Sequence, residues 1–148
     1  MRHRNRLIIL IVIAAGLLLA ACGGQASDDE VSGGEPAKVE PVGGTDLNRV
    51  ILSAEAAKRL DIQTAPVRSE GSGTEMVIPY AAVLYDPNGE TWTYTNPEPL
   101  TFVRQDIKVD HIEGDLAVLL EGPPSGSAVV TVGATELWGI EYGGIEED

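Results

Sequence analysis

The sequence predicts a mainly β fold: a small single β-domain of six to seven strands with one short helix near residues 54–60. Beyond residue 47 the chain consists of short apolar or alternating runs, the pattern of buried and half-buried strands. Clusters of Gly, Pro, Asn and Asp separate these runs and are typical of turns. No segment of the domain keeps a long helical period. We therefore place the β-domain at residues 47–142 and a flexible tail at 143–148.

The start of the chain has the order of a secretory signal. "MRHRNR" carries three arginines, and an uncharged run of 15 residues follows, from Leu7 to Ala21. This run is shorter than the roughly 20 apolar residues that a bilayer core requires. A basic start, an apolar middle and small residues at the end predict a signal peptide at residues 1–21.

The only cysteine of the chain, Cys22, directly follows this signal. Leu19-Ala20-Ala21-Cys22 resembles the lipobox of bacterial lipoproteins. The resemblance implies cleavage before Cys22, a diacylglycerol on its sulfur, and anchoring at the extracytoplasmic face of a bacterial membrane. The alternative is an uncleaved signal anchor with an incidental cysteine. In either case no second thiol exists for a disulfide, so the domain must be held by packing.

Residues 22–46 are predicted to be a lipidated, disordered tether. Gly, Ser, Pro and charged residues dominate this stretch, and it has no apolar period. The whole chain has a formal net charge of −13, with 23 acidic and 10 basic residues. This acidity argues against nucleic acid as a partner and against direct docking on anionic lipid heads. Its simplest role is solubility and spacing from the membrane.

The first half of the domain is predicted to alternate strand, helix and strand. A short strand at 49–52 leads to Ser53, a good N-cap, and Glu55 lies in the first turn, where the helix dipole favours it. Leu52 and Ala57 occupy the positions of a hydrophobic staple. Extended structure resumes at Ile62. Arg68–Thr74, with two glycines and two charged side chains, is predicted to be a surface loop.

The second half reads as strands joined by turns. Residues 80–95 are predicted to be a β-hairpin around Asp86-Pro87-Asn88-Gly89, with Trp92 and Tyr94 on one side of the strand. Residues 100–112 are predicted to form a strand pair or one bent strand. "LAVLLEG" and "AVVTVG" are further strands, separated by the turn "GPPSGS". The segment "ATELWGIEYG" trails from the last strand.

The domain offers little chemistry. His111, with Asp110 and Glu113 nearby, could supply at most half of a metal site, whereas structural zinc needs four nitrogen or sulfur ligands. We therefore interpret His111 as a surface histidine. The run from Asp86 to Glu90 superficially resembles a calcium loop, but its twelfth position is Pro97 instead of an acid. Serine elbows and phosphate loops are absent from the sequence. We predict no catalytic residue, no cofactor and no metal, and hence no enzyme.

Three stretches together resemble the periplasmic adaptor subunits of bacterial efflux systems (membrane fusion proteins, RND/HlyD-like). They are "VILSAEAAKRLDIQTAPV", "VIPYAAVLYDPNGETWTY" and "VRQDIKVDHIEGDLAVLLEGPPSGSAVVTVGATELWG", which lie in the order of the family. The resemblance implies a membrane-proximal β-domain, built in full adaptors from the two ends of the chain. The lipoyl, helical-hairpin and barrel domains would fall between Arg68 and Thr74, where this chain has only seven residues.

Some positions depart from the family pattern. Asp61 stands where the adaptors usually have glycine after the helix; because aspartate tolerates the left-handed region, the turn can be kept. Asp110 and the pair Pro123-Pro124 also differ from it.

The resemblance implies a lipid-anchored binding or structural module, accessory to a membrane efflux transporter. Its expected partners are the membrane, through the lipid on Cys22, and integral-membrane transporter subunits of RND or ABC type. The alternative is a free-standing lipoprotein that binds a ligand or has a structural role in the cell envelope. The lack of a recognisable catalytic motif in the sequence argues against an enzyme.

Overall fold

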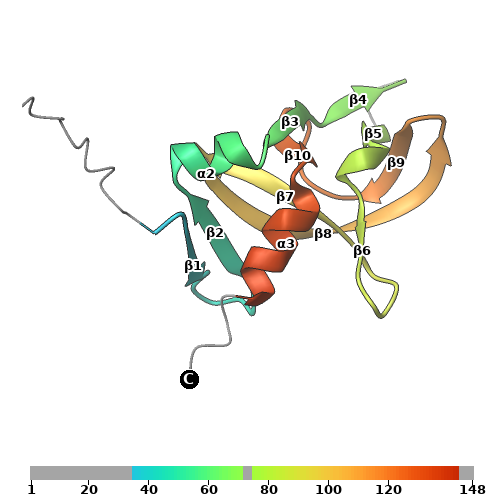
Figure 1. Ribbon diagram of the computed structural model, residues 1–148. Helices are drawn as coiled ribbons and strands as arrows, with labels where there is room; N and C mark the ends of the chain where they lie inside the picture. The colour runs from blue at the N-terminus through green and yellow to red at the C-terminus, as the bar shows by residue number, and fades with distance from the viewer. Residues whose placement is uncertain (1–34, 72–74, 144–148) are drawn as a thin grey trace, which may run out of the picture. The chain divides into compact units, whose positions relative to one another are not determined.

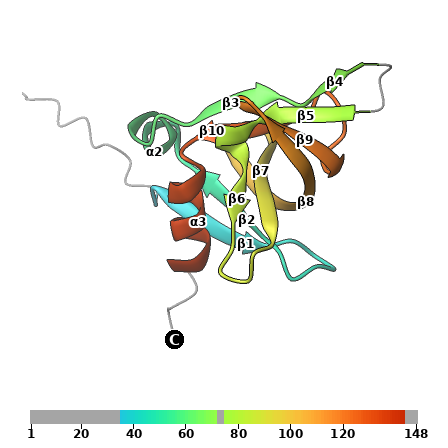
Figure 2. The ribbon, with the colours of Figure 1, turned by 90° about the vertical axis from the view of Figure 1, so that its right-hand side faces the viewer.

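The computed structural model describes residues 35–71 and 75–143, which belong to one compact unit (Figures 1 and 2). The unit is mainly β, as the sequence predicts. Seven strands follow one another through hydrogen-bonded neighbours in the order β3-β10-β7-β8-β9-β5-β4. The predicted signal peptide, Cys22 and residues 23–34 lie outside the described residues, as does 144–148 of the predicted tail.

The sheet is nearly closed because β3 (Gln63–Pro66) and β4 (Arg68–Glu70) form an almost continuous strand. Only Val67 separates them, and it is buried. The first part pairs with β10 (Ala128–Val132), and the second part pairs with β5 (Glu75–Pro79). The Val67 amide donates to the Ser127 carbonyl at 2.8 Å, which extends the pairing with the β10 side. The chain from Gln63 to Glu70 therefore joins the two ends of the strand path.

The strand β8 (Thr101–Glu113) links the two parts of the sheet. It is one long strand with register irregularities, so the alternative of one bent strand, predicted for residues 100–112, is confirmed. It pairs with β7 (Thr91–Glu98) and, in succession, with β2 (Asn48–Leu52) and β9 (Leu116–Glu121). Register irregularities between Lys108 and His111 mark the bend at which β9 takes over.

Residues 37–46 correct the predicted tether. Ala37–Pro41 is a strand, β1, that pairs antiparallel with β2, and residues 42–47 turn between them. Val42 and Leu47 close this turn through a 2.9 Å bond between the Leu47 carbonyl and the Val42 amide. The strand lacks a clear apolar alternation, because Lys38, Glu40 and Pro41 are mixed with two apolar residues. Pairing with β2 orders it, and the domain therefore includes residues before 47.

The helix α2 (Ala54–Arg59) forms as predicted, and local chemistry fixes both of its ends. Ser53 is extended, and its hydroxyl accepts from the Ala56 amide at 3.1 Å. At the other end Asp61 adopts a φ of +50°, the left-handed conformation predicted for it. The Ile62 amide then bonds to the Ala57 carbonyl at 3.1 Å, which directs the chain into β3.

The predicted hairpin is confirmed between β6 (Leu84–Tyr85) and β7, although Tyr80–Ala82 forms a short 3₁₀ helix, η1. In its turn the Gly89 amide donates to the Asp86 carbonyl at 3.0 Å, and Gly89 has a φ of +87°. Desolvation acts to raise the pKa of Asp86, but amide donors from Glu90 and Asn88 lower it overall.

A second helix, α3 (Ala134–Gly143), replaces the trailing segment that the sequence predicted. It contacts β1 and β2 (Figure 2). Gly133 makes the sharp entry from β10 at a φ of +87°; a Cβ there would lie 2.2 Å from Cδ1 of Ile62. The Leu137 amide bonds to the Gly133 carbonyl at 3.0 Å and begins the helix. Among the described residues, the domain therefore carries the α-helix α3 in addition to the predicted α2.

Part of the predicted surface loop Arg68–Thr74 is a strand. Arg68–Glu70 forms β4 and pairs in register with β5, so the loop proper is confined to residues 71–74, of which the structure describes Gly71. All three residues of β4 are exposed, as predicted for the link. With six residues in α2 and ten in α3, neither described helix has the length and hydropathy of a bilayer-crossing segment.

Two hydrophobic clusters fill the unit. The barrel core lies among the strands of the nearly closed sheet. Its buried members are Val67, Ile78, Ala82, Val83, Ile107, Ala117, Leu119 and Val129. The helix-side core lies where α2 and α3 pack on β2 and β7. Its buried members are Val50, Leu52, Ala56, Tyr94, Phe102, Val130, Ala134 and Leu137.

Candidate functional site

The predicted candidate residues occupy separate places. Cys22 lies outside the described residues. His111 lies exposed on β8, and its Nδ1 is 2.9 Å from Oδ2 of Asp110. Within residues 35–71 and 75–143, no three His, Cys, Asp or Glu side chains are grouped so that they could hold a metal ion. The remaining candidates are buried polar groups and concave surfaces.

A buried ion pair joins α3 to the sheet. Arg104 on β8 is 8% exposed and Glu141 on α3 is fully buried. The Arg104 Nη2 lies 3.4 Å from Glu141 Oε1, which is an ion pair without the geometry of a hydrogen bond. Glu141 Oε2 accepts a hydrogen bond from the Tyr94 hydroxyl on β7. Burial, and then this bond to the carboxylate, raises the pKa of Tyr94 far above its usual range.

Three aromatic rings enclose the guanidinium of Arg104. Its Cζ lies 4.2 Å from the ring centroid of Trp92, 5.1 Å from that of Trp138 and 5.3 Å from that of Tyr142. All three distances fall within the range of cation–π attraction. Trp92 and Tyr94 thus face the same side of β7, as their spacing predicted. The rings desolvate the ion pair and leave its charges out of reach of a ligand.

This Arg104–Glu141 cluster is best explained as a fastening of α3. Removing one member of a buried ion pair leaves an uncompensated charge, which typically costs about 3–5 kcal/mol. Sequence analysis missed the cluster, although one signal was present. Leu137 and Glu141, and likewise Trp138 and Tyr142, are spaced as i and i+4 neighbours on a helix.

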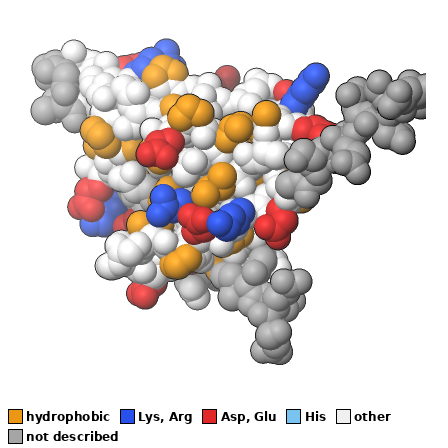
Figure 3. Space-filling model, turned by 90° about the vertical axis from the view of Figure 1, so that its left-hand side faces the viewer, with side chains coloured by type: hydrophobic (Ala, Val, Ile, Leu, Met, Phe, Trp, Pro, Cys, Tyr) orange, Lys and Arg blue, Asp and Glu red, His pale blue; other side chains and the backbone are white. Residues whose placement is uncertain are grey.

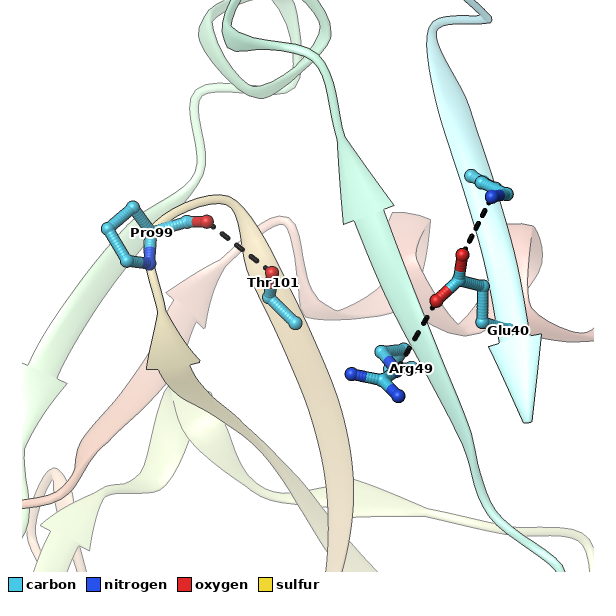
Figure 4. A network of polar contacts seen from close by, with 5 residues as sticks. Glu40, Arg49, Pro99 and Thr101 are labelled. Carbon is cyan, nitrogen blue, oxygen red and sulfur yellow. Dashed lines mark hydrogen bonds and ion pairs between the residues drawn. The ribbon is translucent and has the colours of Figure 1, made fainter. Parts of the chain in front are cut away.

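The surface near β1 carries a second network, which is solvated (Figure 4). Glu40 Oε1 lies 2.7 Å from the Lys38 ammonium, and its Oε2 lies 3.6 Å from Arg49 Nε. The hydrogen bond and the charge of Lys38 lower the pKa of Glu40. Nearby, the Thr101 hydroxyl donates to the Pro99 carbonyl at 3.4 Å. Ion pairs that are open to solvent to this extent contribute little to stability.

A polar groove opens where β7 and β10 diverge. The two strands share one paired position, Val129 with Thr95. The groove has a volume of about 700 Å³. Its lining consists of uncharged side chains of β7, β8 and the turn before β10: Thr95, Asn96, Pro97, Gln105, Ser125 and Ser127 among them. The Asn96 amide is already bonded to the carbonyls of Glu98 and Thr101.

An apolar pocket of about 380 Å³ lies beside α2. Its floor is formed by Leu52 and Ala56, both at most 5% exposed, and Ile140 of α3 contributes a wall. Pro36 and Ala37, at the start of the described domain, form a further side. Figure 3 shows the face of β1 and α2, where hydrophobic side chains lie between acidic and basic ones.

The two concave surfaces and the Arg104–Glu141 cluster are thus the features with functional potential. Of these, only the surfaces are accessible from solvent. No known protein family, curated protein or solved structure matches this chain.

Proposed function

We propose that the chain is a lipid-anchored, extracytoplasmic binding or structural module that is accessory to a membrane efflux transporter. The lipid on Cys22 would hold it at the membrane. Integral-membrane transporter subunits of RND or ABC type would be its partners. The domain would contact them without forming a conduit, because the sequence has no room for the helical hairpin of the adaptors.

One observation carries this proposal. The segments that resemble the two ends of an adaptor, residues 49–67 and 76–139, pair with each other in one β-domain, through β2 with β8 and β3 with β10. The pairing of β3 with β10 joins the first segment to the second, and β4 returns directly into β5. A domain that is built from both ends of a longer chain can fold alone only if strands of the two ends pair with each other. Here β3 pairs with β10, and β4 pairs with β5.

The test is capture of the intact lipoprotein from membranes after mild cross-linking, followed by mass spectrometry. We expect transporter subunits to be enriched relative to a matched control protein, in which residues 1–34 are fused to an unrelated domain. The Cys22→Ser variant, without the anchor, should lose most of this enrichment. If the native chain captures the same proteins as the control, the accessory role is wrong.

The alternative, a free-standing ligand-binding lipoprotein, is favoured by the apolar pocket beside α2. A pocket of about 380 Å³ is within the lower range of small-molecule sites. The same capture experiment separates the two functions, because a free-standing binder would show no transporter enrichment.

A further inference from the structure

The apolar pocket beside α2 has a nearly uniform lining. Leu52, Ala56, Leu60 and Ile140 present only hydrocarbon to it, and none of them has a polar side-chain atom. Such a surface cannot satisfy a polar ligand, whose groups would lose their hydrogen bonds to water. The pocket is therefore suited to an aliphatic chain.

One charged side chain, Arg59, completes the lining. Arg59 is in the last turn of α2 and is exposed, and it forms no ion pair with another described residue. Lys58, beside it in the same turn, is also basic and exposed. Glu55 and Asp61 lie within four positions of Arg59, but no ion pair joins either carboxylate to its guanidinium. A guanidinium at the edge of an apolar pocket complements a carboxylate on an otherwise aliphatic molecule.

We propose that this pocket binds one free long-chain fatty acid, with its hydrocarbon chain against Leu52, Ala56 and Ile140 and its carboxylate on Arg59. The volume suits this ligand: 380 Å³ holds about a dozen methylene groups if each occupies roughly the 30 Å³ of a water molecule. A longer fatty acid would extend its end beyond the pocket.

The position of the pocket indicates a source for the ligand. Its Pro36–Ala37 side is where the chain arrives from Cys22, and residues 23–35 span at most about 45 Å even when fully extended. A bilayer that holds the proposed lipid anchor would thus lie close to the pocket. The acyl chains of the anchor itself fit less well, because their ester and amide linkages carry no negative charge for Arg59.

The proposal uses the lipid anchor only for this placement. The pocket would bind a fatty acid whether or not the domain contacts a transporter. Failure of the transporter capture would overturn the proposed function, but it would not change the labelling of the pocket.

The experiment is photolabelling of the full chain in phosphatidylcholine nanodiscs with a diazirine derivative of hexadecanoic acid. Peptide mapping should place the label on α2, β1 or α3. Ala37→Phe, which fills the pocket from its half-exposed side, should reduce this labelling at least tenfold. The matched control Ala65→Phe, at a half-buried position of β3, should label like the native chain.

Charge recognition is tested by competition. Unlabelled hexadecanoic acid should compete with the probe better than its methyl ester, which lacks the carboxylate. Arg59→Gln should weaken competition by the acid roughly two- to fivefold and remove its advantage over the ester. Arg68→Gln, at an exposed arginine of β4, should change neither. Shortening the acid below about twelve carbons should weaken competition by about fourfold per methylene group lost, because these groups lie within the pocket.

Three results would overturn the proposal. The first is labelling that Ala37→Phe leaves unchanged, or that is confined to residues 1–34, since either means non-specific insertion. The second is equal competition by acid and ester. The third is a pocket that stays unlabelled in the native chain.

Discussion

The barrel core and the helix-side core differ in what they bury. The barrel core is built from aliphatic side chains contributed by most strands of the nearly closed sheet and by η1. The helix-side core adds to its apolar residues an aromatic-enclosed ion pair between Arg104 and Glu141. The sheet holds the first core together through the backbone, whereas α3 has no strand partner. The difference teaches that the terminal helix depends on side chains for its attachment.

Burying the two charges of the helix-side core costs desolvation free energy, which apolar side chains at the same positions would not. A buried ion pair often contributes no more than well-packed apolar residues of similar volume, but it is damaged severely when one partner is lost. The barrel core has no such dependence. Truncating one of its side chains costs only the transfer free energy of the removed atoms and the free energy of the cavity that remains. The two cores should therefore respond differently to mutation, pH and insertion.

The largest effect is expected at the ion pair. Glu141→Leu should lower the free energy of unfolding by about 3–5 kcal/mol, because Arg104 would remain buried without a counter-charge. Arg104→Met should cost a similar amount. The double variant should regain most of the loss, as measured by urea denaturation. If the stability loss of the double variant equalled the sum of the two single losses, Arg104 and Glu141 would not be energetically coupled, and this prediction would be wrong.

The next effect is expected in the barrel core. Ile78 is fully buried, and Ile78→Ala should cost about 3 kcal/mol through lost burial and a residual cavity. The loss should be the same in low and high salt, since no charge is involved. Ile112→Ala, on a strand but 41% exposed, is the matched control and should cost less than about 1 kcal/mol. A strong salt dependence at Ile78 would contradict the comparison.

A smaller effect is expected at Tyr94. Tyr94→Phe removes the donor to Glu141 and should cost about 1–3 kcal/mol at pH 7. Because the folded pKa of Tyr94 is raised above its unfolded value of about 10, its stabilisation is complete below pH 10 and declines above it. The gap between native and variant should then narrow by up to about 1.4 kcal/mol per pH unit.

The control for Tyr94 is Tyr80→Phe. Tyr80 is 44% exposed, so this variant should lose less than about 0.5 kcal/mol at pH 7. A constant gap between the native chain and Tyr94→Phe up to pH 11, in parallel urea titrations, would refute the assigned cause.

The smallest effect is expected at the link between β4 and β5. Ten Gly/Ser residues inserted after Gly71 should cost under about 1 kcal/mol, because loop-closure entropy grows slowly with length. The same insertion between Val130 and Thr131 should unfold the domain, since it interrupts β10 at the buried Val130. Similar losses of stability at both positions would contradict the assignment of the connection between β4 and β5 as a loop outside the sheet.

The elements that sequence reasoning predicted are those determined by neighbouring residues. The cap at Ser53 and the turn from Asp86 to Gly89 need only side chains within four positions. The strands β9 and β10 are apolar runs bounded by glycine and proline. Each of these signals is complete within one short window of the chain.

The elements that were missed depend on distant partners. The strand β1 has few apolar residues and is ordered by its pairing with β2. The helix α3 contains Gly139 and buries the charge of Glu141, which interrupts its apolar period. Arg104 and Glu141 belong to different elements, so their pairing becomes visible only when β8 and α3 are placed together. The concave surfaces have the same origin, because each is lined from several elements.

The strand formed by Gln63–Glu70 also bears on how quickly this protein folds. The hairpins β6–β7, β7–β8 and β8–β9 join residues that are close in the chain and can form early. Closing the sheet is different: the Thr131 hydroxyl bonds to the Gln63 carbonyl, 68 positions away. Such non-local contacts demand loop closure before they stabilise anything, and they slow folding. We therefore expect the pairing of β3 with β10 to be the late, rate-limiting step.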